Sequence, residues 1–221
     1  MLERFISLLA PHQCMACGCE GGLLCEWCIY DAVEELPERC YRCLGVSADS
    51  RVCSKCRKHT VLEHVWVRTQ YADFAHDLVY ALKFSRAKAA ARVIASLLDE
   101  SLPYLEEGTI ITYVPTATSR VRVRGYDQTR LIARELATIR GLKCQRLLIR
   151  TGQARQVRSS KSQRAAQAAG SYRPVSGLSA DRTVLLIDDI VTTGATLESA
   201  AKVLRSAGVK HVYAAAFAQK Q

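Results

Sequence analysis

Two adjacent acids followed by a threonine-rich turn make residues 184–196, VLLIDDIVTTGAT, the part of the sequence best suited to chemistry. The run predicts a buried parallel strand, then the acids, then a small-residue turn that opens a helix. The amides and hydroxyls of such a turn, with the positive end of the helix, can surround a phosphate dianion. The residues predicted to bind that phosphate are Val191, Thr192, Thr193, Gly194, Ala195 and Thr196.

The acids Asp188 and Asp189 must face another part of the ligand, because carboxylates beside a phosphate would repel it. Ribose hydroxyls or a magnesium-bound diol suit them. Ligands of open α/β sheets bind beyond the carboxyl ends of the strands, where this pair is expected. A ribose 5-phosphate therefore satisfies both halves of the predicted loop 188–196. The alternative is an ordinary strand–turn–helix junction with a threonine cap.

Cysteines form the second chemical pattern, since nine of the ten lie before residue 57 and eight of these occur as CxxC pairs. A CxxC turn directs two thiolates at one tetrahedral ion, and two such turns complete the shell of a structural zinc. Redox-active pairs are the alternative, but the sequence lacks a thioredoxin-like surround. The spacing leaves open which pairs share an ion, and Cys19 has no partner. The predicted ligands of two zinc sites are Cys14, Cys17, Cys25, Cys28, Cys40, Cys43, Cys53 and Cys56.

The net charge of +10 comes from one stretch, because residues 118–167 hold thirteen Lys and Arg against two acids. Such a local excess indicates a polyanionic ligand, and a solvated basic face is the alternative. The sequence has no uncharged apolar run of about 18 residues, so we expect no membrane insertion. Ten cysteines without a recognisable export signal favour a reducing, cytoplasmic location.

Alternating strand and helix patterns must position these residues. After a boundary near residues 57–62, strands are predicted at 65–70, 109–114, 145–149, 183–187 and 211–216. Apolar residues at three- and four-residue spacing predict helices between them, for example around Leu97 and Leu136, and Gly141 and Gly208 suit helix ends. This order predicts an α/β domain with a mostly parallel sheet.

The run 184–196 resembles the motif by which type I phosphoribosyltransferases bind phosphoribosyl pyrophosphate (PRPP). With the tandem CxxC pairs, LKF at 82–84, VP at 114–115 and RGYDQ at 124–128, the sequence is similar over essentially its whole length to the ComF family of competence-associated proteins. The resemblance implies a type I phosphoribosyltransferase fold at 61–221, behind a double zinc ribbon with four-cysteine sites at 1–60.

The implied activity is pentosyl transfer, in which an unidentified nitrogenous acceptor displaces pyrophosphate from PRPP with magnesium bound. Asp188 and Asp189 would be the catalytic acids that fix the ribose hydroxyls and favour a cationic sugar. Lys83 either contributes to the nucleotide site or merely faces solvent. The resemblance assigns pyrophosphate to Arg120, Arg122 and Arg124, and a mobile loop at 152–167 to Arg155, Arg158, Lys161 and Arg164.

A single-stranded DNA-binding competence protein is the alternative function, with a PRPP site that is regulatory or catalytically idle. The zinc turns, the basic stretch and the family's association with DNA uptake support it. Only Tyr126 is aromatic in that stretch, so no base-stacking platform is evident. The suggested partners are PRPP, single-stranded DNA, the uptake machinery and, because relatives with this fold often form dimers, a second copy of the chain.

Overall fold

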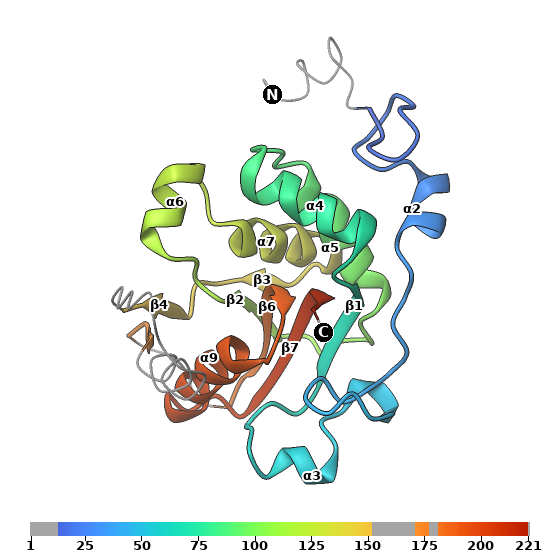
Figure 1. Cartoon of the computed structure of the whole chain (residues 1–221). Coiled ribbons are helices and arrows are strands. Elements are labelled where there is room, and N and C mark those ends of the chain that lie inside the picture. The colour runs from blue at the N-terminus through green and yellow to red at the C-terminus, as the bar shows by residue number, and fades with distance from the viewer. Residues whose placement is uncertain (1–12, 152–170, 177–180, 221) are drawn as a thin grey trace, which may run out of the picture.

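A five-stranded parallel sheet in the order β1-β7-β6-β2-β3 forms the centre of the protein (Figure 1). The computed structural model describes residues 13–151, 171–176 and 181–220. A separate antiparallel pair joins β4 to β5. The strands are β1 Val65–Gln70, β2 Ile110–Tyr113, β3 Lys143–Cys144, β4 Leu148–Arg150, β5 Tyr172–Pro174, β6 Thr183–Val191 and β7 His211–Gln219. The helices are α2 Glu26–Ala32, the 3₁₀ turn η1 Ala48–Ser50, α3 Ser54–Arg57, α4 Asp73–Phe84, α5 Ala90–Glu100, α6 Thr118–Arg124, α7 Gln128–Arg140 and α9 Ala195–Ser206.

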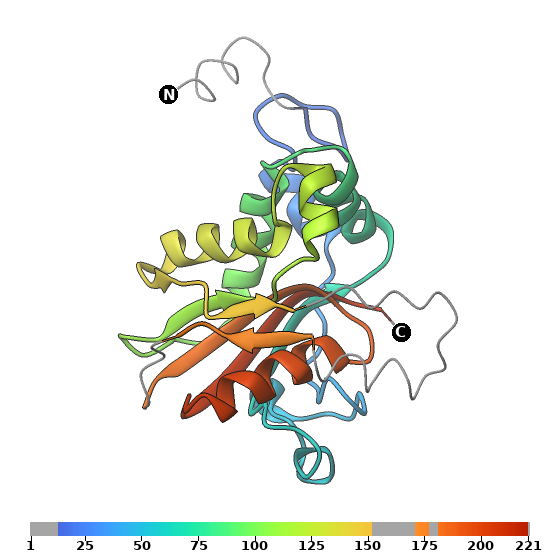
Figure 2. The ribbon, with the colours of Figure 1, turned by 90° about the vertical axis from the view of Figure 1, so that its left-hand side faces the viewer.

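Helices cover both faces of the sheet, with α4, α5 and α7 on one side and α9 on the other (Figure 2). Leu97 and Leu98 of α5 and Leu136 of α7 are fully buried in the first of two apolar cores. Leu197 and Leu204 of α9 are buried in the second. This two-sided cover confirms the predicted α/β fold.

The predicted helix ends agree with the structure. Gly141 caps α7 with φ 64°, and Gly208 has φ 97° shortly after α9. These left-handed conformations suit glycine, which has no Cβ to clash.

Three predicted segments differ from the structure. The strand predicted at 145–149 begins after β3 has ended at Cys144, and only its last two residues belong to a strand, β4, which pairs with β5 from Leu148. The predicted loop 188–196 begins as strand, since β6 stays paired with β7 as far as Val191. The resemblance implies a pyrophosphate-binding loop at 115–125, and this segment contains helix α6. Local apolar patterns did not reveal how far each neighbouring strand would extend.

The cysteine-rich segment runs along the β1 side of the sheet, with its first part near α4 and its last part near α3 (Figure 1). Cys14 and Leu24 belong to the core beneath α4, α5 and α7. Cys40 and Tyr41 belong to the core beneath α9. The two halves of the segment therefore pack on opposite faces of the sheet. The predicted boundary at residues 60 and 61 stays a prediction.

No helix within the described ranges is both long enough and apolar enough to cross a membrane.

Candidate functional site

The acid pair lies where β6 projects past its neighbour β2. Pairing with β2 ends at Ile187, whereas pairing with β7 continues to Val191. Asp188 and Asp189 therefore stand at an open step in the sheet, yet they are only 8% and 6% exposed. The Asp189 amide donates to Asp188 Oδ1 at 2.9 Å. Burial, and then the neighbouring Asp189 charge, raise the pKa of Asp188 well above its usual range.

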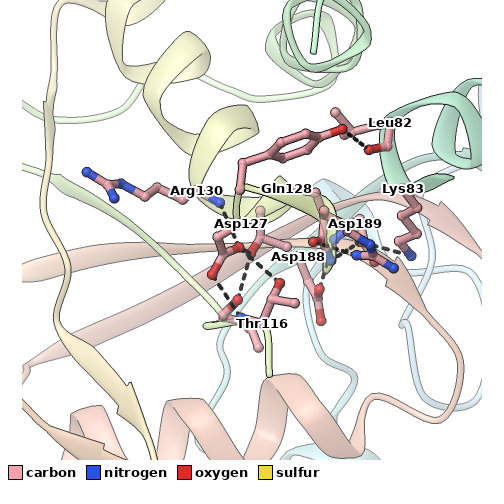
Figure 3. A network of polar contacts seen from close by, with 12 residues as sticks. Leu82, Lys83, Thr116, Asp127, Gln128, Arg130, Asp188 and Asp189 are labelled. Carbon is pink, nitrogen blue, oxygen red and sulfur yellow. Dashed lines mark hydrogen bonds and ion pairs between the residues drawn. The ribbon is translucent and has the colours of Figure 1, made fainter. Parts of the chain in front are cut away.

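Asp189 is held by two side chains from distant parts of the sequence (Figure 3). Lys83 Nζ at the end of α4 lies 2.9 Å from Asp189 Oδ2, and Gln128 Nε2 at the start of α7 donates to the same oxygen at 3.0 Å. The Lys83 side chain is 17% exposed, so it does not face solvent. Lys83 therefore lies at the acid pair, and its contribution to a nucleotide site stays a prediction.

Arg124 is the predicted pyrophosphate arginine that joins this network. Its guanidinium donates to Gln128 Oε1 at 2.8 Å and lies 5.2 Å from the centre of the Phe84 ring. Burial, and then the positive charge of Arg120, lower the pKa of Arg124. Arg120 and Arg122 are exposed on α6. A lowered arginine pKa marks a site where an added anion would be favourable.

Asp127 ties the segment after β2 to the start of α7 (Figure 3). Its carboxylate accepts hydrogen bonds from the Thr116 amide at 2.9 Å, the Thr116 hydroxyl at 3.0 Å and the Thr129 hydroxyl at 2.7 Å. It also caps the helix by accepting from the Arg130 amide. Sequence reasoning assigned no role to Asp127 or Gln128, although an acid directly before an amphipathic run is a known helix-start signal.

The threonine turn between β6 and α9 is open to solvent where a phosphate would bind. Thr192, Thr193 and Thr196 are exposed, whereas Gly194 is buried. Gly194 caps α9 with φ 76°, a left-handed conformation that glycine tolerates. The helix therefore begins directly at the turn, where the Ala195 amide donates to Thr193 Oγ1 at 3.4 Å.

The loop predicted at 152–167, with Arg155, Arg158, Lys161 and Arg164, lies outside the described residues. The antiparallel strands β4 and β5 flank it.

Two groups of four cysteines have the geometry of structural zinc sites. Within each group the sulfur atoms all lie within 4.8 Å of one another. The Cys17 and Cys25 sulfurs are 3.7 Å apart, as are those of Cys43 and Cys53. Zn–S bonds of about 2.3 Å in a tetrahedron place sulfurs about 3.8 Å apart. The groups join consecutive CxxC pairs, Cys14, Cys17, Cys25 and Cys28 in the first and Cys40, Cys43, Cys53 and Cys56 in the second, which settles the pairing left open by the spacing.

A cavity of about 450 Å³ lies beside α7 at the β3 edge of the sheet. Its basic lining residues are Arg130, Arg134 and Arg146, and no acid is among the residues that line it. Figure 3 shows the Arg130 side chain directed away from the acid pair. The cavity is therefore a basic surface separate from the acid pair. The sequence indicated it only through the excess of positive charge in residues 118–167.

Comparison with known proteins gives the family context. Residues 124–221 match the phosphoribosyl transferase domain family. The chain is 28% identical over 202 residues to competence protein ComFC of Streptococcus pneumoniae (strain ATCC BAA-255 / R6), covering 87% of this chain and 86% of ComFC.

Solved structures give a weaker likeness. An adenine phosphoribosyltransferase from Thermoanaerobacter pseudethanolicus is 13% identical with a TM-score of 0.41, covering 87% of this chain and 98% of that one. The glutamine PRPP amidotransferase from B. subtilis is 19% identical with a TM-score of 0.41 over 58% of this chain. This chain spans only 26% of the amidotransferase. Because both scores are low, the fold assignment rests on the observed sheet and the domain match.

The domain match contains the acid pair, Gln128 and Arg124, while Lys83 and both cysteine groups precede it. The chain is therefore similar to ComFC over most of its length, and its two groups of four cysteines precede the part that matches the phosphoribosyl transferase domain family.

Proposed function

We propose that the chain binds PRPP at the end of β6 and transfers its phosphoribosyl group to a nitrogenous acceptor. The observation that carries this proposal is the buried acid pair, in which Asp189 is held by Lys83 and Gln128 beside an exposed threonine turn. A sugar phosphate carries hydroxyls that suit the acid pair and a phosphate dianion that suits the turn. The domain family supports the same reaction class.

Each part of the site has a role in this reaction. The turn holds the 5-phosphate and so fixes the position of ribose C1. The acids accept hydrogen bonds from the ribose hydroxyls, and their negative charge stabilises a cationic sugar. Arg124, with Arg120 and Arg122 on the same helix, would bind the diphosphate. A nitrogen lone pair of the acceptor attacks C1 as the bond from C1 to the pyrophosphate oxygen breaks, and pyrophosphate leaves with the bonding electrons.

The oxygen donors here also fit magnesium. Within the described part of the chain, no lysine or arginine forms an ion pair with Asp188, so its carboxylate is available to a hydrated hard cation. Magnesium bound with PRPP would neutralise charge on the diphosphate. Asp188 and Asp189 would hold it through oxygen, directly or through its water shell.

Calorimetric titration with PRPP and magnesium tests the proposal. The wild-type protein should bind saturably, and the Asp188→Asn, Asp189→Asn double variant should lose binding while remaining folded. Asp181→Asn is the matched control, because Asp181 is exposed and precedes β6 at the opposite end of the strand. Wild-type protein that fails to bind would refute the proposal. Binding without turnover on a panel of nitrogenous acceptors would favour the idle or regulatory alternative.

The basic cavity favours a second candidate function, binding of single-stranded DNA. Arg130, Arg134 and Arg146 form no ion pair with any acid that the structure describes, so their charge is available to phosphates. The name of the relative, a competence protein, supports the same candidate. We propose that DNA would bind here separately from PRPP.

Fluorescence anisotropy with a labelled oligonucleotide at several salt concentrations tests this candidate. Replacing the three arginines with alanine should lower the salt slope by about 2, since each single-strand phosphate contact contributes about 0.7. Arg173→Ala is the control, because Arg173 is exposed on β5. An unchanged slope in the triple variant would exclude the cavity as the DNA surface.

A further inference from the structure

The second cysteine group lies directly against the threonine turn. Tyr41, between the ligands Cys40 and Cys43, is 2% exposed and packs its ring on Gly194. A Cβ at Gly194 would lie 3.0 Å from Tyr41 Cδ2 and closer still to Cε2. The close approach therefore needs glycine at this position as well as the left-handed backbone.

Hydrogen bonds fix Tyr41 on the helix side of the turn. Its hydroxyl donates to Glu198 Oε1 at 2.8 Å, in the first turn of α9, and lies 3.3 Å from the Thr60 hydroxyl. Arg42 forms an ion pair with the same Glu198 carboxylate. Two successive residues of one CxxC turn thus hold the start of the helix.

The same CxxC turn is also fixed on the strand side. The Tyr41 carbonyl accepts from Gln219 Nε2 at 2.9 Å, and the Gln219 oxygen accepts from Arg39 at 3.0 Å. Gln219 is the β7 partner of Val191, the last residue of β6. The contacts therefore reach both ends of the turn, Val191 before it and Glu198 after it.

We propose that the second cysteine group is part of the phosphate site, with Tyr41 and Arg42 as positioning residues for the turn. A metal ion held by this group fixes the CxxC turn, and Tyr41 then holds Gly194 and the neighbouring amides in the orientation that accepts a dianion. The inference rests on the proposed phosphate binding by that turn. Because binding energies are reciprocal, phosphate ligands should tighten metal binding at the second group by the same factor.

The first cysteine group provides an internal control. It packs on the α4 face of the sheet, whereas the second packs on the α9 face. Cys17 and Cys43 are equivalent exposed ligands, each the second cysteine of the first CxxC pair in its group. If metal loss acted only by destabilising the whole fold, Cys17→Ser and Cys43→Ser would affect the threonine turn equally. The proposal predicts that only Cys43→Ser alters the conformation of the turn.

The experiment compares Cys43→Ser, Cys17→Ser and Tyr41→Ala with the wild type. Zinc content, PRPP affinity by calorimetry and hydrogen exchange of amides 191–196 are measured in each. Tyr41→Ala should keep two zinc ions, weaken PRPP binding about tenfold, equivalent to about 1.4 kcal/mol, and speed exchange in the turn. Cys43→Ser should do the same with one zinc lost, and Cys17→Ser should lose one zinc with little change in the turn.

Controls separate this inference from the proposed function. Tyr104→Ala should change nothing, because Tyr104 is 83% exposed. If the wild type does not bind PRPP, the proposed function fails, but exchange at 191–196 in Tyr41→Ala still tests the positioning role. Wild-type exchange and affinity in a folded Tyr41→Ala protein would overturn the inference. Equal effects of Cys17→Ser and Cys43→Ser on the turn would also overturn it, since the second group would then have no special role.

Discussion

The two carboxyl groups of the acid pair are almost completely buried, and they have different hydrogen-bond partners. Asp189 has a lysine and an amide on one oxygen, whereas Asp188 accepts the amide of its neighbour. In the ligand-free protein the raised pKa favours the protonated form of Asp188, and magnesium bound with PRPP would favour its ionised form. A buried carboxyl of this kind lowers the folding stability of the ligand-free protein, and such destabilising groups are common at ligand-binding sites.

Replacing Asp188 with asparagine should therefore stabilise the ligand-free protein. The folded state binds more protons than the unfolded state between the unfolded pKa, about 3.8, and the raised folded pKa. Wild-type stability should fall as pH rises through this window, by about 1.4 kcal/mol for each unit of pKa difference. Thermal unfolding of Asp188→Asn should lack that fall. A variant that is less stable than the wild type at neutral pH would contradict the argument.

Lys83 should matter for both stability and binding. Lys83→Gln leaves Asp189 without its cation, which we expect to cost about 1–3 kcal/mol in urea unfolding and to weaken PRPP binding. Lys210→Gln is the matched control, because Lys210 is exposed just before β7. Equal unfolding free energies of the two variants would show that the Lys83 contact contributes little.

At the scale of elements, strand existence was predictable and strand length was not. Residues 65–70 were predicted and found as β1, because the β-branched and aromatic residues Val65, Trp66, Val67 and Thr69 mark a strand locally. The extension of β6 through the acids depends on β7, in which Ala214 to Gln219 pair with Leu186 to Val191. Helix α6 was missed because its arginines and valines lack a helical apolar stripe. Lys83 could not be assigned, since only the fold brings α4 beside β6.

The cap of α7 gives a prediction about an element. Asp127→Ala removes the acceptor for the Arg130 amide and for Thr116, so unfolding stability should fall by about 1–2 kcal/mol. Asp127→Asn retains one carbonyl oxygen and should lose less. Chemical denaturation of the two variants measures the difference, and an alanine variant as stable as the asparagine variant would show that the cap is unimportant.

At the scale of the whole molecule, each cysteine group packs into a different apolar core. The sequence predicted the ligands but left their pairing open, because spacing alone does not reveal which CxxC turns meet in space. Their placement on opposite faces depends on the sheet, which lies elsewhere in the chain. The second group thereby reaches the phosphate turn, a relation that local sequence patterns cannot show.

Metal analysis of the purified chain should find two zinc ions per molecule. Cys19→Ser should leave that number unchanged, because Cys19 belongs to neither group of four. A strong chelator should lower the melting temperature, since metal binding contributes folding free energy. A stoichiometry of one, or a loss of zinc in Cys19→Ser, would contradict the assignment of ligands.

The order of the strands has a consequence for synthesis on the ribosome. Among the strands that the structure describes, β1 pairs with β7 alone, and Tyr41 is held by Gln219, so these segments find their partners in a strand that is made much later. A nascent chain can close its cysteine groups as soon as they emerge, because their ligands are close in sequence. The second group can then bind metal before β7 leaves the exit tunnel, but it packs against the sheet only afterwards. Truncated chains that lack β7 should therefore bind zinc yet expose β1, and so be targets for chaperones and proteases.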